Sequence, residues 1–514
     1  MMKLLFELLF ITALVFLLAA CSSKPVAKGT TELEEVGPWL RQKKMTQEEV
    51  NAPIEEVSIS TTCGDIIGVK KDGYTEFRSV RYATSERFEA PVLVTKWDGV
   101  FDATVWGDRC FQYQGLYGTN ADVTGQFYAD EALITWPAVY SEDCLNLNIW
   151  TPDGSENCPV LIYIHGGAFV GGSNSTSDID GAVYARNGII TIAINYRLGA
   201  FHSAYGDGYT GYLAIQDQAA ALHWVRDNIT DYGGDPSKIT LMGESAGAIS
   251  TQNLLASPLV EDGLVSGAIM MSGAGDFSSL GYPTVSSMVE PVWTAMKRMV
   301  DAESIADLKA LSTRELYSLW INSLGEYSST AALPIINGVG MTEGIDQAFN
   351  DGSIKDVPCI IGMLSEDVVP YSLYKIAVDY AQNRAEAGGE PVYLYYFDRN
   401  QPGENDFGAF HGADLYYVFG TLYRNWRPFD ETDYRIAEDM IAYISNFVKT
   451  GDPNGDGLAV WEAATTERQE FMRFGDDEAA MYAPSPDDLI HTQNTNPPFP
   501  YAKHLNGTPT DEAR

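Results

Sequence analysis

Ser245 stands at the centre of a Gly-x-Ser-x-Gly pattern that it forms with Gly243 and Gly247. An apolar run precedes the pattern and small helix-forming residues follow it, which predicts a strand, a sharp turn and a helix. Such a turn strains the serine backbone, exposes its hydroxyl and leaves no room for side chains at the flanking glycines. Ala246 would begin the helix, where unpaired N–H groups and the helix dipole favour a developing anion. The pattern therefore predicts a nucleophilic serine, provided that the chain also supplies a base, an acid and an oxyanion site.

A glycine pair after a predicted strand could hold the negative charge that such an attack creates. Residues 160–164 form a continuous apolar run, and His165, Gly166 and Gly167 follow it directly. Successive glycines let the backbone turn its N–H groups toward one point, which suits the oxyanion of a tetrahedral intermediate. A plain glycine loop would have the same sequence. We expect His165, which lies on this loop, to have a structural hydrogen-bonding role and not to act as the base.

The general base has to be one of six histidines. In an α/β-hydrolase the catalytic residues follow the chain order serine, acid, histidine. His411 satisfies this order and stands in a loop of small residues, 408–414, after a predicted strand. The other histidines lie before the serine, in an apolar helical stretch where core packing is expected, or in the polar tail: His165, His202, His223, His491 and His504.

The acid should lie between Ser245 and His411, at the end of a strand. Residues 357–361 predict such a strand, and Glu366 and Asp367 follow it. Either carboxylate could hold the imidazole in its productive tautomer and stabilise the protonated ring. The residues alone do not separate the two acids.

Strands and helices that alternate along the chain must position these residues. An alternating pattern at 58–82 predicts an antiparallel hairpin that turns at Asp72-Gly73, and apolar residues at helical spacing predict a helix at 215–228. Continuous apolar runs predict buried parallel strands at 160–164, 189–194, 239–242, 267–271, 357–361 and 392–397. This order predicts an α/β fold, with a mostly parallel central sheet flanked by helices. Residues 275–345 look helical and would form a cap beside the site.

The composition excludes several classes of function. A chain of 514 residues with 45% hydrophobic and 12% aromatic residues can bury a large globular core. It has 33 Lys and Arg against 70 Asp and Glu, a formal net charge of −37. This charge argues against a nucleic-acid partner and against electrostatic adhesion to anionic lipid. A solvated acidic surface is expected.

The first residues predict export. The apolar run at 8–20 is too short to cross a membrane and fits the core of a signal peptide at 1–20. It ends in Leu-Ala-Ala-Cys, which resembles the bacterial lipoprotein box, so that cleavage would leave Cys21 to carry a lipid. An ordinary signal peptide with an incidental cysteine is the alternative. We expect a polar tether at 21–56 and a single domain at 57–514, anchored to a membrane of the cell envelope by the lipid only.

The motifs together resemble the type-B carboxylesterase family, which includes cholinesterases and para-nitrobenzyl esterases. The resemblance runs from about residue 57 to about residue 475. It rests on motifs in the order of the family: Glu142-Asp143-Cys144-Leu145-Asn146-Leu147-Asn148, His165-Gly166-Gly167, Asn195-Tyr196-Arg197-Leu198-Gly199, Gly243-Glu244-Ser245-Ala246-Gly247, His411 and Gly451-Asp452-Pro453-Asn454.

The resemblance implies an α/β-hydrolase fold and a role for each site residue. Ser245 would be the nucleophile and His411 the general base. In the family, the acid lies five residues after the glycine that ends the preceding strand, which is Asp367 when counted from Gly362. The family usually has glutamate there, so Asp367 is a departure and Glu366 stays an alternative. The oxyanion hole would use three backbone N–H groups, those of Gly166, Gly167 and Ala246.

The resemblance also implies two structural links. It pairs Cys144 with an upstream cysteine, for which Cys110 is the match, and it pairs Arg87 with Glu142. Without the resemblance the cysteine pairing is open, although export would permit a disulfide. The state of three further cysteines is not predicted: Cys63, Cys158 and Cys359.

These features predict a serine carboxylesterase that cleaves small to medium esters through an acyl-enzyme, without a metal or an organic cofactor. Residues 452–457 begin like a calcium loop, but Ala463 stands where a bidentate glutamate is needed, so a turn is expected. Two alternatives are a catalytically silent, cholinesterase-like adhesion or binding module and a lipase for long acyl chains. Silent relatives typically lose the serine or the histidine, and here both are present.

Overall fold

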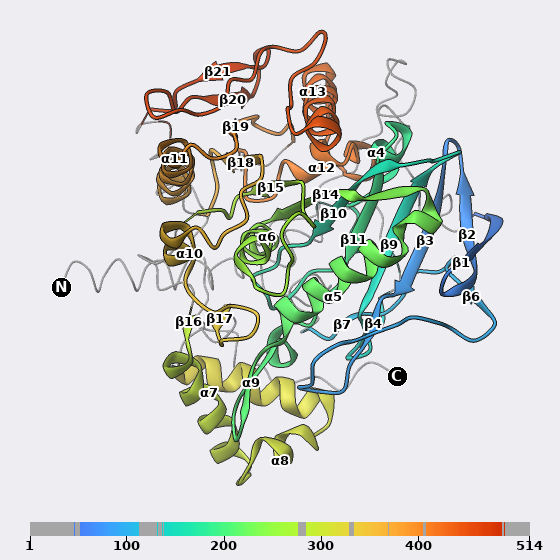
Figure 1. Cartoon of the computed structure of the whole chain (residues 1–514), viewed down its shortest axis with the longest axis vertical. Helices are drawn as coiled ribbons and strands as arrows, with labels where there is room; N and C mark the ends of the chain where they lie inside the picture. Colours follow the sequence, from blue (N-terminus) through green and yellow to red (C-terminus); the bar gives the residue numbers. More distant parts are fainter. Residues whose placement is uncertain are drawn as a thin grey trace.

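A 13-stranded sheet forms the centre of the molecule, with helices on both of its faces (Figure 1). The computed structural model describes residues 46, 52–112, 131, 136, 138–275, 284–327, 334–368, 370–403, 408–485 and 488. The predicted signal peptide and Cys21 lie outside these residues. The last two residues of the predicted tether, Glu55 and Glu56, already belong to strand β1 (Glu55–Thr61).

Seven neighbouring strands of the described sheet are parallel; the continuous apolar runs predicted six of them, and β20 was not predicted. Their residues are buried on both faces because helices cover both sides, which favours unbroken apolar sequences. In spatial order they are β11 (Ile190–Ile194), β10 (Cys158–Ile164), β14 (Gly234–Glu244), β15 (Gly267–Met271), β18 (Cys359–Leu364), β19 (Val392–Phe397) and β20 (Phe471–Phe474).

Antiparallel strands extend the sheet at both edges. The turn at Asp72-Gly73 is confirmed, since it joins β2 (Gly64–Lys71) to β3 (Tyr74–Arg81). The predicted hairpin at 58–82 is nevertheless incomplete, because β1 pairs with β2 through a second turn at Thr62-Cys63. Strands β9 (Asn146–Pro152) and β21 (Ala480–Tyr482) are also antiparallel to their neighbours, whereas β6 (Val100–Asp102) pairs with β2 in parallel.

Each face of the sheet packs against its own helices. Along β10, Val160, Ile162 and Ile164 join one apolar core. That core includes side chains of α5 (Leu213–Asn228) and α6 (Ala246–Ala256). Leu161 and Tyr163 point to the second core, which is covered by α4 (Ala182–Arg186), α12 (Leu415–Val418) and α13 (Glu431–Thr450). The alternation follows from the two-residue period of a strand.

The predicted cap is helical and lies at the lower end of the molecule in Figure 1. It contains α7 (Ser286–Met299), α8 (Ile305–Lys309) and α9 (Thr313–Tyr327). The predicted ion pair between Arg87 and Glu142 is present, with Nε 2.7 Å from Oε2. The same guanidinium donates to the carbonyl oxygens of Lys309 (2.8 Å) and Leu311 (2.5 Å), so it also ties the cap to the body.

Further small strands and helices complete the description of the fold. The small strands are β4 (Ala83–Thr84), β5 (Val92–Leu93), β7 (Arg109–Cys110), β8 (Tyr140–Ser141), β12 (Ser203–Gly206), β13 (Tyr209–Tyr212), β16 (Thr284–Val285) and β17 (Ile335–Ile336). The other helices are η1 (Gly199–Phe201), η2 (Ile229–Tyr232), α10 (Ile345–Asp351), α11 (Pro370–Ala387) and η5 (Leu422–Arg424). Within the described ranges, no helix is long and apolar enough to cross a membrane.

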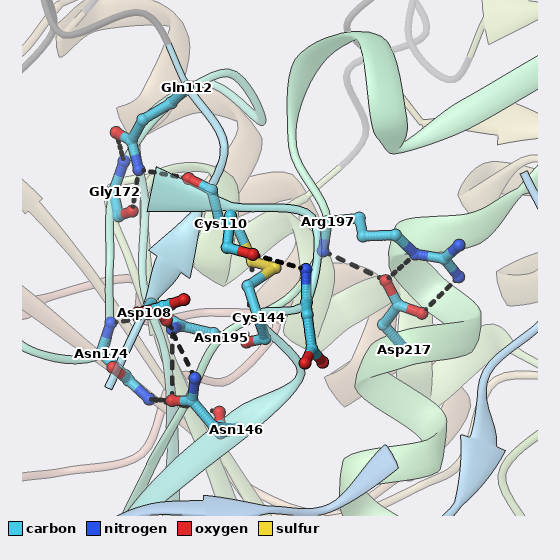
Figure 2. Close-up of a disulfide and its surroundings, with 12 residues drawn as sticks. Asp108, Cys110, Gln112, Cys144, Asn146, Gly172, Asn174, Asn195, Arg197 and Asp217 are labelled. Carbon is cyan, nitrogen blue, oxygen red and sulfur yellow. Dashed lines mark hydrogen bonds and ion pairs between the residues drawn. A yellow bond between two sulfur atoms is a disulfide. The ribbon is translucent and has the colours of Figure 1, made fainter. Parts of the chain in front are cut away.

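The structure contains the disulfide between Cys110 and Cys144 that the resemblance implied (Figure 2). Among the cysteines that the structure describes, three are unpaired thiols: Cys63, Cys158 and Cys359. The segment that begins like a calcium loop forms a turn after α13, in which Asp452 Oδ1 accepts hydrogen bonds from the backbone N (2.9 Å) and the Nδ2 (2.8 Å) of Asn454.

Candidate active site

Ser245 occupies the sharp turn that its neighbours predicted. It separates β14 from α6 and has φ 56° and ψ −122°, a left-handed conformation that is rare for a residue with a side chain. A methyl group built on Gly243 would lie 2.1 Å from the carbonyl oxygen of Gly247. One built on Gly247 would lie 1.9 Å from the carbonyl oxygen of Ile164 in β10. Both glycines are therefore required by the close approach of backbone.

His411 and Asp367 meet next to this turn. His411 Nδ1 lies 2.6 Å from Asp367 Oδ1, although 44 residues separate them in the chain. The other ring nitrogen, Nε2, lies 3.2 Å from Oε1 of Glu244, the residue that precedes Ser245. The imidazole thus lies between Asp367 and the residue that directly precedes Ser245.

Asp367 is held from several sides. It is fully buried, and its Oδ2 accepts a hydrogen bond of 2.6 Å from the Ser272 hydroxyl. The backbone N–H of Val368 donates to Oδ1 at 2.8 Å. The Glu366 side chain lies against Gly408, where a built Cβ would be 2.5 Å from its Cγ, and its backbone N–H donates to the carbonyl oxygen of Ala409. Of the two acids that the sequence left open, Asp367 lies within hydrogen-bond distance of His411.

Residues 165–172, here named the oxyanion loop, follow β10 and reach the serine turn. A methyl group built on Gly166 would lie 2.5 Å from Glu244 Oε2 and 3.0 Å from Ser245 Cβ, so only a glycine lets the loop come this close. Gly167 has φ 105°, and Ala168 and Phe169 also have positive φ, at 54° and 60°. Gly166 thus lies beside the serine, Gly167 follows it in the loop, and Ala246 lies directly after Ser245, in the first turn of α6.

The other histidines have structural surroundings. The ring of His165 is buried, stacks on Tyr196 with centroids 4.6 Å apart, and contacts the carbonyl oxygen of Gly166 through Nδ1. His202 is also buried. The expectation that His223 packs into the core is wrong, because its side chain is 24% exposed and Nε2 lies 3.0 Å from Glu261 Oε2. His491 and His504 lie outside the described residues.

Three buried carboxylates surround the His411 ring: Glu244, Asp367 and Asp414. Burial disfavours the imidazolium, but the negative charges of Glu244 and Asp367 and the hydrogen bond to Asp367 outweigh this effect and raise the pKa of His411. Burial also raises the pKa of Glu244, an effect that His411 opposes. The Glu244–His411 pair therefore retains one proton to higher pH than an isolated histidine would.

Sequence reasoning gave no role to Glu244, Asp414 or Ser272. Glu244 and Asp414 stand inside motifs that were recognised in the sequence. Glu244 directly precedes the proposed nucleophile and Asp414 follows the proposed base by three residues, and an acid so near a proposed catalytic residue is the signal that could have found them. Burial raises the pKa of Asp414 to about 6, against the hydrogen bond that it accepts from Tyr395. Ser272 directly follows β15 and carries no local signal.

A Glu244→Gln variant is expected to shift the acid limb of the kcat/KM profile to lower pH. His411 accepts a proton only when its ring is neutral, so activity is lost as the pH falls through the pKa of His411. Removing the Glu244 charge removes a cause of the raised pKa and lets the neutral ring persist to lower pH. Initial rates with a neutral ester across the pH range measure the shift. An unshifted limb would contradict the expectation, and Glu366→Gln is the matched control.

Comparison with known proteins decides the family. The sequence model of the carboxylesterase family matches residues 55–377 and 367–489. The chain belongs to the carboxylesterase family. It is 29% identical over 478 residues to a para-nitrobenzyl esterase of Bacillus subtilis (strain 168), covering 80% of this chain and 94% of that one. It is 27% identical over 507 residues to a cocaine esterase of Homo sapiens, covering 81% and 87%.

Solved structures of carboxylesterases agree with this assignment. A thermophilic PNB esterase superposes with a TM-score of 0.72 at 25% identity, over 82% of this chain and 97% of that chain. A second PNB esterase gives 0.70 at 26% identity, over 82% and 97%. The protein thus has the α/β-hydrolase fold and is a serine carboxylic ester hydrolase.

Proposed function

We propose that this carboxylesterase cleaves small to medium esters through an acyl-enzyme on Ser245. The observation that carries the proposal is the hydrogen bond of 2.6 Å between His411 Nδ1 and Asp367 Oδ1. The same imidazole lies 3.2 Å from Glu244, which directly precedes Ser245 in its strained turn. The relatives include a para-nitrobenzyl esterase, which supports a compact ester as substrate.

Acylation begins when His411 takes the proton of the Ser245 hydroxyl and the oxygen attacks the ester carbonyl carbon. The C=O π bond opens, and its electron pair moves to the carbonyl oxygen. The N–H groups of Gly166, Gly167 and Ala246 stabilise this oxyanion, aided by the N-terminus of α6. The tetrahedral intermediate then collapses, the bond to the alcohol oxygen breaks, and His411 returns its proton to the alcohol.

Deacylation uses the same groups. His411 takes a proton from water, and the resulting hydroxide oxygen bonds to the acyl carbon. The second tetrahedral intermediate releases the acid, and His411 returns the proton to Ser245. In both halves the Asp367 carboxylate keeps Nδ1 protonated and stabilises the imidazolium.

Covalent labelling tests this proposal against a silent binding module. A fluorophosphonate is expected to phosphonylate Ser245, and mass spectrometry of the digested protein would place the added mass on the peptide that contains residues 243–247. A label on another residue, or none, would contradict the proposal. Hydrolysis rates over a series of acyl chain lengths separate the esterase from a lipase: a maximum at long chains would favour the lipase.

We further propose that the protein is an exported lipoprotein held at a membrane of the cell envelope by lipid on Cys21. The Leu-Ala-Ala-Cys sequence after a short apolar run supports this proposal, and so does the disulfide, since such bonds persist in oxidising compartments. Retention of a Cys21→Ser chain in the membrane fraction would contradict it.

A further inference from the structure

A glutamine beside the disulfide holds the far end of the oxyanion loop. The Gln112 side chain is buried, and its Nε2 donates to the carbonyl oxygens of Cys110 (3.1 Å) and Gly172 (2.8 Å). Its Oε1 accepts a hydrogen bond of 3.0 Å from the N–H of Gly172. Figure 2 shows this amide reaching from the disulfide to Gly172, where it forms hydrogen bonds with both the carbonyl oxygen and the N–H.

Gly172 touches the part of the loop that approaches Ser245. A methyl group built on Gly172 would lie 2.5 Å from the carbonyl oxygen of Gly166 and 2.3 Å from His165 Nδ1. Nδ1 itself lies 2.8 Å from that carbonyl oxygen. Because a carbonyl oxygen only accepts, Nδ1 must carry the proton and donate it. Burial lowers the pKa of His165 to about 4, so the ring stays neutral.

The direction of one oxyanion donor follows from these contacts. The carbonyl of Gly166 and the N–H of Gly167 belong to one peptide group, which is planar and trans, so the two bonds point in opposite directions. Whatever fixes the Gly166 carbonyl therefore also fixes the Gly167 N–H. Gln112 is hydrogen-bonded to Gly172, Gly172 lies so close to the Gly166 carbonyl that a Cβ would not fit between them, and the Gly166 carbonyl shares its peptide group with the Gly167 N–H.

We propose that Gln112 is a positioning residue for ester hydrolysis, which holds the Gly167 N–H in the direction that binds the tetrahedral oxyanion. The Cys110–Cys144 disulfide anchors it, since Cys110 is fixed both by this bond and by its pairing with Ser141. The inference rests on the proposed function. Because the hole binds the oxyanion more strongly than the substrate carbonyl, loss of Gln112 should raise the reaction barrier and leave substrate binding almost unchanged.

A Gln112→Met variant tests the proposal, since methionine has a similar volume and makes none of the three hydrogen bonds. We expect kcat to fall about 10-fold to 100-fold, as for a displaced oxyanion donor, with little change in KM. The inhibition constant of a trifluoromethyl ketone, which adds to the serine hydroxyl as a tetrahedral adduct, should rise in proportion to the loss of kcat/KM. A Gln112→Glu variant keeps an acceptor for the Gly172 N–H but places a second acceptor where Nε2 donates to two carbonyl oxygens, so it should lose at least as much kcat.

An Asn228→Leu variant is the control for a purely structural effect. Asn228 is buried, donates to the carbonyl oxygen of Trp224 at 2.8 Å, and precedes the end of β14 that is remote from Ser245. It should lower the melting temperature and leave kcat and the inhibition constant unchanged.

Wild-type kcat and inhibition in Gln112→Met would overturn the inference, and so would an equal loss of kcat in the Asn228 control. If the Met variant does not fold, the same comparison with Gln112→Glu decides. A wild-type protein that cleaves no ester and takes no fluorophosphonate would instead overturn the proposed function.

Discussion

Replacing Ser245 with alanine is expected to lower kcat by about 10⁵-fold to 10⁶-fold, because the triad acts as a unit and loses covalent catalysis without its nucleophile. The variant should fold and bind substrate, since alanine keeps the Cβ and removes only the hydroxyl. A hydrolysis rate about 10³-fold to 10⁴-fold above that in water would remain, supplied by the oxyanion hole and by binding. Stopped assays with an aryl ester, at high protein concentration and long incubation, measure this residual activity.

The control for Ser245→Ala is Ser250→Ala. Ser250 is also buried in α6, one turn further on, and its hydroxyl donates to the carbonyl oxygen of Ala246 at 2.8 Å. It should cost some stability and little activity. A Ser245→Ala protein that turned over esters at the wild-type rate would refute the assignment of the nucleophile.

Asp367→Asn is expected to lower kcat by about 10³-fold to 10⁴-fold, whereas Glu366→Gln should keep the rate near that of the wild type. Each carboxylate oxygen of Asp367 already accepts two hydrogen bonds: Oδ1 from His411 and Val368, and Oδ2 from Ser272 and Leu364. An amide NH₂ in either place meets a donor. If it faces His411, it forces the proton from Nδ1 to Nε2, and the base can no longer accept from Ser245.

Parallel assays of the two variants, with melting temperatures recorded for both, decide which acid serves the histidine. If Glu366→Gln caused the larger loss of kcat at equal stability, the geometry would be misleading and Glu366 would be the acid. The comparison is matched because both changes replace a carboxylate by its amide at adjacent positions.

The strands of the parallel sheet could be predicted because their signal is local. Residues 160–164 are apolar without interruption, and β10 occupies Cys158–Ile164. The first turn of the N-terminal strands was missed for the same reason. Thr62-Cys63 offers none of the Asn-Gly or Asp-Gly signal that marked the turn at Asp72-Gly73.

The serine turn was predictable, but the surroundings of His411 were not. Glycine spacing fixes a tight bend, whereas the contact between Ser272 and Asp367 joins residues 95 positions apart. Glu366 and Asp367 are adjacent, so the backbone conformation of the loop after β18 decides which carboxylate faces His411. In that loop the Glu366 backbone N–H donates to the carbonyl oxygen of Ala409, a contact between distant segments that composition cannot reveal. His223 shows a similar limit, because helical periodicity did not show that it lies at the edge of its apolar face.

The left-handed residues of the site have a consequence for how this enzyme can evolve or be engineered. Ser245, Ser272, Ala168 and Phe169 all carry positive φ, and such conformations cost about 1–3 kcal/mol each when a side chain is present. Only the surrounding packing can compensate, so part of the stability of the fold is committed to keeping the site in place. Mutational tolerance should therefore be lowest in the cores that press on the site, even at positions that never contact substrate. Stabilising substitutions elsewhere would widen the range of changes that the catalytic loops can accept.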